Sequence, residues 1–97
     1  MYATIRRYHT KAADADEIIR RVNEGFVPII SQAPGFIAYY ALVTEDGVAA
    51  SISLFATQKQ SEEATQLAAQ WVKENIAGLL PNLPETTAGE VRVQKGG

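Results

Sequence analysis

The side chains in this sequence that could bear chemistry include a lone tryptophan, a lone histidine and four tyrosines. Trp71 and Asn75 lie four positions apart, so on a helix they would share a face that could hold a ligand. Packing explains Trp71 more simply, because aromatic residues in a helical stripe usually belong to the core. Asn75 could equally well hydrogen-bond a ligand or cap the end of its helix. His9 is the only histidine, the residue type that can exchange protons near neutral pH, and it could accept a proton from a phenol, although a strand end favours solvent exposure. Trp71, Asn75 and His9 are therefore the candidate catalytic residues.

Aromatic and cationic side chains of the expected strands form a second set, which could bind an aromatic compound. The candidate substrate-binding residues are Tyr8, Tyr39, Tyr40, Arg7 and Phe55. Tyrosines can orient a ring by stacking and by a hydroxyl hydrogen bond, but packing between strands accounts for them equally well. Because neighbours alternate along a strand, either Arg6 or Arg7 must point inward. An inward arginine could bind a carboxylate or enolate, or pair with an acid such as Glu90.

Composition excludes several other classes of site. The chain has no cysteine, which rules out disulfides, iron–sulfur clusters and cysteine nucleophiles. A single histidine without ligands at metal-binding spacing predicts no metal site. Ser51 and Ser53 lack a histidine–acid arrangement, so nucleophilic catalysis has no support. The net charge of −2 argues against a nucleic-acid partner, and no segment is apolar enough to cross a bilayer. We expect a cytoplasmic protein.

The spacing of apolar residues predicts the elements that must position these side chains. Residues 2–9 alternate as a strand, and residues 14–32 have helical spacing with Asp14 or Asp16 at the N-terminal end as a capping carboxylate. Pro28 should kink this helix or divide it near Gly25. The sequence Pro34-Gly35 should end it.

The second half of the chain also shows strand and helix patterns. A strand over 36–44 and a return strand over 48–57 flank Asp46-Gly47, a strong hairpin signal. A helix over about 61–80 carries one apolar stripe: Ala64, Leu67, Ala68, Trp71, Val72, Ile76 and Leu79. A loop with prolines precedes a last strand at 89–94.

The order β-α-β-β-α-β predicts an α+β, ferredoxin-like fold, a four-stranded antiparallel sheet with both helices on one face. We expect one domain over residues 1–97, ordered from about 2 to 94. The other face of the sheet would carry Phe, Tyr and Ile side chains in place of polar ones, which predicts a homodimer packed sheet to sheet. Of the adjacent Tyr39 and Tyr40, one should face the helices and the other the partner.

Three stretches, "QAPGFIAYYALVTEDGVAASISLF", "AAQWVKENIAGLLP" and "GEVRV", resemble small antibiotic biosynthesis monooxygenase-like (ABM) proteins. The resemblance extends from about Tyr2 to Val93. It implies a dimeric α+β barrel with a cavity between sheet and helices, and it matches Trp71 to a tryptophan that lines the family's pocket. Some members oxidise aromatic phenols or quinols with oxygen and no cofactor, and others degrade haem. The haem-degrading branch has a histidine later on this helix, and no histidine follows Trp71 here.

The leading hypothesis is a cofactor-independent monooxygenase of small phenol- or quinol-type compounds, acting as a homodimer. The alternative is a non-catalytic dimer that binds a small apolar ligand or serves as an accessory protein. A regulatory dimer of the kind attached to DNA-binding domains is a weaker third, because the chain has no such domain.

Overall fold

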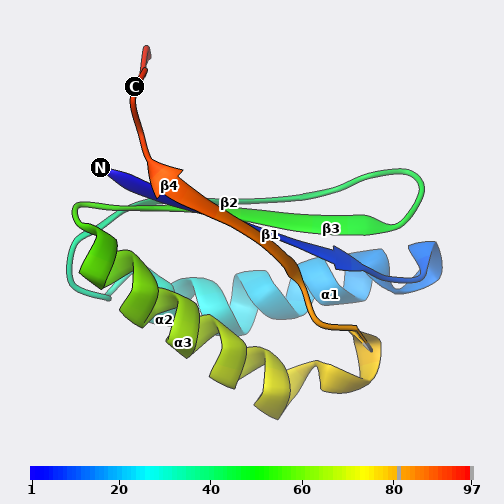
Figure 1. Cartoon of the computed structure of the whole chain (residues 1–97). Helices are drawn as coiled ribbons and strands as arrows, with labels where there is room; N and C mark the ends of the chain where they lie inside the picture. The colour runs from blue at the N-terminus through cyan, green and yellow to red at the C-terminus, as the bar shows by residue number, and fades with distance from the viewer. Residues whose placement is uncertain (81, 97) are drawn as a thin grey trace.

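The computed structural model describes residues 1–80 and 82–96. Its main elements are β1 (Tyr2–His9), α1 (Ala15–Arg21), α2 (Val27–Ile30), β2 (Phe36–Val43), β3 (Val48–Phe55), α3 (Gln58–Asn75) and β4 (Glu85–Glu90). The strands form one antiparallel sheet in the order β2-β3-β1-β4. All three helices lie on the same side of this sheet (Figure 1). The expected ferredoxin-like arrangement is confirmed.

The register of the sheet decides which side chains face the helices. Along β1, Thr4, Arg6 and Tyr8 are buried, while Arg7 and His9 are exposed. Strand alternation therefore places the first three on the helix side and the last two on the open side. Apart from a bulge at Ile37 in β2, residues of β1, β3 and β2 lie directly opposite one another, so the register carries these two sets over to the neighbouring strands.

The open face is mostly apolar at its centre. One row across the sheet runs Tyr40, Ile52, Ile5 and Thr87, and Ala38, Leu54 and Ala3 lie beside it. Tyr40 is 58% exposed, and Leu42 on the same strand is also exposed. Tyr39 is turned the other way and contacts Phe26 of the helix layer. The two tyrosines thus face opposite sides of the sheet, as the sequence requires.

The first helical segment is interrupted at the predicted place. A π-helical turn, Val22–Phe26, separates α1 from α2, and Pro28 lies in the first turn of α2. Pro28 has no N–H to donate, so the regular α-helical ladder cannot continue through it. Gly35, with φ at 79°, then reverses the chain into β2. The expected capping by a carboxylate is wrong for Asp14, whose side chain makes no cap hydrogen bond, because a 3₁₀ turn over Ala12–Asp14 leads directly into α1.

The hairpin is confirmed, with Gly47 at φ 90° between β2 and β3. The return strand ends two residues earlier than expected, at Phe55, because α3 begins at Gln58 rather than near Ser61. The Thr57 hydroxyl caps this helix by accepting a hydrogen bond from the Gln60 N–H. A 3₁₀ turn over Ala77–Leu79 replaces the expected last turn. Leu67 is also not part of the buried stripe, since it is 44% exposed.

The predicted last strand at 89–94 is largely wrong. β4 spans Glu85–Glu90, so it begins within the expected loop and shares only Gly89 and Glu90 with the predicted strand. Its partner β1 begins at Tyr2, opposite Glu90, and the last bond of the pair joins Val91 N–H to the Met1 carbonyl at 2.9 Å. After this bond the chain leaves the sheet (Figure 1). Among the described residues, no helix combines the length and apolar character that crossing a membrane would require.

Candidate functional site

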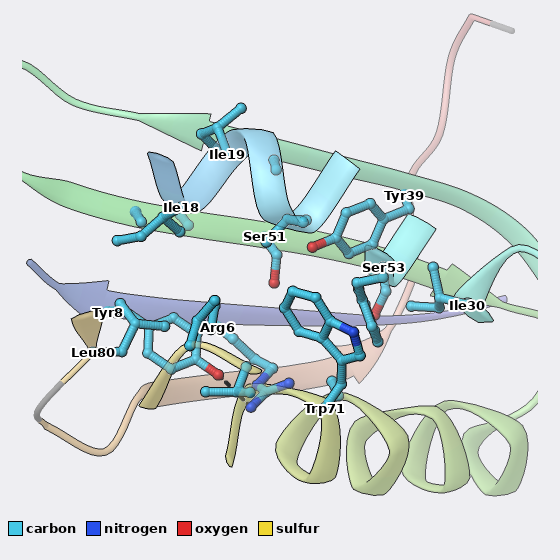
Figure 2. A pocket seen from close by; sticks show the side chains of 18 of the residues that line it. Arg6, Tyr8, Ile18, Ile19, Ile30, Tyr39, Ser51, Ser53, Trp71 and Leu80 are labelled. Atoms are coloured by element: carbon cyan, nitrogen blue, oxygen red, sulfur yellow. Dashed lines mark hydrogen bonds between the residues drawn. The ribbon is translucent and has the colours of Figure 1, made fainter. Parts of the chain in front are cut away.

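A cavity of about 60 Å³ lies between the helix face of the sheet and the three helices. Its walls are largely aliphatic and aromatic, with Ile18, Ile30 and Trp71 from the helices and Tyr39 from β2 (Figure 2). This volume is well below the roughly 300–1,000 Å³ of sites for drug-sized ligands. The cavity as it stands has no room for a porphyrin.

The aromatic wall is built from three elements that are far apart in the sequence. Phe26 lies between Tyr39 and Trp71, with ring centroids 5.7 Å from the first and 5.5 Å from the second. Both pairs are angled, edge-to-face for Tyr39 and tilted for Trp71, which are favourable geometries for aromatic rings. A flat ligand entering the cavity would meet this wall.

The π-helical turn brings its backbone close to the indole ring. A Cβ atom built on Gly25 would lie 3.0 Å from Cζ2 of Trp71. Such a contact is tighter than ordinary van der Waals packing, so glycine is the residue that leaves Trp71 its present position. π-turns within helices are often found at functional sites. Here the turn shapes the helix side of the cavity.

One end of the cavity is polar. Arg6 is 7% exposed, and its Nη2 donates a hydrogen bond to the Tyr8 hydroxyl. The guanidinium carbon also lies 5.4 Å from the centroid of the Tyr8 ring. Within the described part of the chain, Arg6 Nε has no hydrogen-bond partner although it is fully buried. The cavity therefore places a positive charge beside its apolar walls.

The phenols of Tyr8 and Tyr39 remain neutral over the ordinary pH range, because both pKa values are raised. Burial raises the pKa of the Tyr8 hydroxyl, and the neighbouring Arg6 charge and hydrogen bond offset this only in part. Burial also raises the pKa of Tyr39, against a hydrogen bond to Ser51 and the charge of Arg6. Figure 2 shows the Tyr39 hydroxyl directed toward Ser51. Both tyrosines can act as hydrogen-bond donors. Neither is a phenolate near neutral pH, so neither can accept a proton from a substrate.

A second hollow, of about 330 Å³, is also bordered by Arg6 and Tyr8. It is lined by Arg6 and Tyr8, by Val72 and Lys73 of α3, and by residues 82–84 before β4. Arg6, Tyr8, Val72 and Leu80 are common to both hollows. The arginine and tyrosine thus border both the inner cavity and this second hollow, called the outer hollow below.

Three of the eight candidate residues line the cavity. They are Trp71, Tyr8 and Tyr39. Phe55 is close by but fully buried in the core, edge-to-face with Phe36 at 5.9 Å. Asn75 is exposed, and its Nδ2 donates a hydrogen bond to the Trp71 carbonyl at 2.9 Å. Its amide therefore binds the backbone at the C-terminal end of its own helix.

The other three candidates are directed away from the cavity. The His9 side chain is 63% exposed, with Nε2 3.6 Å from Oε1 of Glu85. Arg7 and Tyr40 belong to the open face of the sheet. Arg6, not Arg7, is the inward arginine, and its partner is Tyr8 rather than the expected acid. No group of three potential metal ligands occurs among residues 1–80 and 82–96.

Sequence reasoning did not select Phe26 or Arg6 for the site. Phe26 has a visible signal, since it lies four positions after Val22 in the apolar pattern of the first helix. Arg6 shares strand parity with Tyr8, so selecting Tyr8 as an inward residue already implied Arg6 and excluded Arg7.

Comparisons with known proteins identify the fold. No family model matches the chain, and no curated protein matches its sequence. Solved structures do match. The NE2512 protein of unknown function from Nitrosomonas europaea is 19% identical, with a TM-score of 0.81 over 99% of this chain and 93% of that one. The ActVA-Orf6 monooxygenase of Streptomyces coelicolor, solved with nanaomycin D, is 13% identical, with a TM-score of 0.80 over 99% and 91%.

A haem-degrading protein has the same architecture. MhuD from Mycobacterium tuberculosis, solved with two hemes in its active site, is 14% identical, with a TM-score of 0.77 over 99% of this chain and 100% of that one. At these identities the likeness concerns the arrangement of helices and strands. The chain has the ferredoxin-like fold of the antibiotic biosynthesis monooxygenase-like proteins.

Proposed function

We propose that this protein binds a small phenol- or quinol-type compound in the inner cavity and oxidises it with molecular oxygen, without a cofactor. The observation that carries the proposal is the aromatic wall of Tyr39, Phe26 and Trp71 beside a cavity that is lined mostly by apolar side chains. A monooxygenase with this fold supports the same reading.

The chemistry needs no external reductant. A phenol and one molecule of oxygen give a quinone and one molecule of water, so the substrate itself supplies the electrons. The electron-rich phenolate is the form that reacts with oxygen, and a dry cavity keeps the intermediates from side reactions with water. The protein's part is to bind the ring, orient it against Trp71 and exclude water.

The earlier assignment of proton transfer to His9 does not fit this site. His9 lies on the opposite face of the sheet, and the described residues that line the cavity include no carboxylate and no imidazole. Tyr8 and Tyr39 have raised pKa values and cannot serve as bases near neutral pH. In this proposal the substrate loses its proton to solvent before it is enclosed.

The test is oxygen uptake with a set of monocyclic phenols and hydroquinones. Trp71→Phe keeps an aromatic ring but removes part of the wall, and we expect it to lower turnover by about tenfold or more through misplacement of the substrate. Tyr40→Phe, on the open face, is the matched control and should leave turnover unchanged. Unchanged turnover in the Trp71 variant removes that residue from the mechanism. Saturable binding with no oxygen uptake favours the non-catalytic alternative.

We also propose that the working form is a homodimer packed through the open face. The apolar row centred on Ile52 would otherwise remain in water, and a second copy offers the same surface in return. Ile52→Lys should convert the protein to a monomer in size-exclusion chromatography with light scattering. Leu67→Lys removes an exposed apolar residue from α3 on the helix side and should leave the mass unchanged. A wild-type monomer at micromolar concentration contradicts the proposal.

A further inference from the structure

Arg6 is a buried cation without a counter-ion. It is 7% exposed, and arginine stays protonated in proteins. The ion pairs among the described residues involve His9, Arg20 and Arg21, and no carboxylate of this part of the chain comes within 4.0 Å of Arg6. An unpaired buried charge is costly, so a site that keeps one usually has a partner for it.

The sheet cannot provide this partner. Glu85 of β4 is opposite Arg7, and its carboxylate lies by His9 on the open face. Glu90 is opposite Tyr2, four residues further along the strand from Arg6. A second copy packed on the open face would be separated from Arg6 by the sheet itself. An anion that neutralises Arg6 must therefore enter one of the two hollows that this residue lines.

The polar groups at this point match two oxygen atoms. Arg6 Nε–H has no acceptor, and the Tyr8 hydroxyl, which accepts from Nη2, still has its own proton to donate. Two adjacent donors, one of them charged, suit a carboxylate better than a single hydroxyl or phenolate oxygen. A small rotation of the arginine would expose Nε to the carboxylate, and the two hollows that Arg6 lines leave room for that movement.

The surroundings extend the match to the rest of the ligand. From Arg6 the inner cavity continues along apolar walls to Trp71 (Figure 2), while Lys73 adds a second positive charge in the outer hollow. We infer that the site takes a small aromatic carboxylate, with its ring against Trp71 and its carboxylate on Arg6 and Tyr8. This inference rests on the proposed function for the ring and goes beyond it by specifying a negatively charged ligand.

Binding can be followed with the protein's own tryptophan, because Trp71 is the only one in the chain and lines the cavity. We would titrate the full chain with 4-hydroxybenzoate and with 4-hydroxybenzamide, two probes of nearly equal shape that differ in charge. The wild type should bind the carboxylate more tightly by about tenfold or more, the effect of a charge-assisted hydrogen bond. Equal affinities would overturn the inference and leave the proposed function standing. No binding of either probe would overturn both.

Three variants locate the effect. Arg6→Gln should abolish the preference for the carboxylate, and Arg6→Lys should retain part of it. Arg7→Gln changes the net charge equally but on the opposite face, and it should keep the full preference. Circular dichroism and a thermal melt establish that each variant is folded. An equal loss in the Arg6→Gln and Arg7→Gln variants would assign the preference to overall charge and overturn the inference.

Discussion

Arg6 is a residue that this protein keeps at a cost in stability, and the cost can be measured. Its guanidinium is 7% exposed, has one unpartnered N–H and makes its side-chain hydrogen bond to the Tyr8 hydroxyl. Replacing a buried charged group and its partner with apolar residues of similar size is often stabilising by about 1–4 kcal/mol. We expect the double variant Arg6→Met/Tyr8→Phe to be more stable than the wild type by about 1–3 kcal/mol.

The single variants should behave differently, because each leaves one partner behind. Tyr8→Phe removes the acceptor of a charged donor and leaves the cation more poorly satisfied, which should cost about 1.5–3 kcal/mol. Adding Arg6→Met to this variant should then reverse the sign of the effect. Such a reversal is a coupling between two contacting residues that independent sites do not show.

The measurement is urea unfolding at equilibrium, followed by tryptophan fluorescence and by circular dichroism at one fixed protein concentration. Arg7→Met, at the exposed neighbouring position, is the control and should stay within about 0.5 kcal/mol of the wild type. If the double variant is less stable than the wild type by about 1 kcal/mol or more, with unchanged m-value, Arg6 is a structural residue. Arg6 would then not be an unpaired cation held at a cost in stability.

Two further predictions concern the backbone and the buried phenols. Gly35→Ala should cost about 1–3 kcal/mol, because φ is 79° there and a Cβ would lie 1.9 Å from a side-chain oxygen of α3. Gly78→Ala, with nothing within 4 Å of its Cβ, should be near neutral, and equal melting temperatures for the two variants would refute the strain. Burial raises the pKa of Tyr39, so the folded state binds its proton more tightly than the unfolded state does. The resulting stability should be fully present below about pH 10 and be lost as pH rises through the higher folded pKa. Tyr39→Phe should flatten this alkaline decline in pH-dependent melts, and an unchanged slope would contradict it.

Local patterns determined much of this fold. Apolar spacing located both helical regions, Asp46-Gly47 located the hairpin, and Pro28 with Gly25 marked the break that became a π-turn. These features depend on neighbouring residues and on the conformational limits of proline and glycine, which the sequence states directly. The order of the elements, β-α-β-β-α-β, then predicted the ferredoxin-like fold.

Tertiary structure decided the rest, because it depends on partners distant in sequence. Alternation put Arg6 and Arg7 on opposite faces, as it did Tyr39 and Tyr40, but only packing against the helices decided which member of each pair faces the cavity. β4 ends at Glu90, opposite Tyr2 at the start of β1, so its extent follows the paired strand and not the valines that come after it. The missing counter-ion of Arg6 is visible only once every nearby carboxylate has been placed in space.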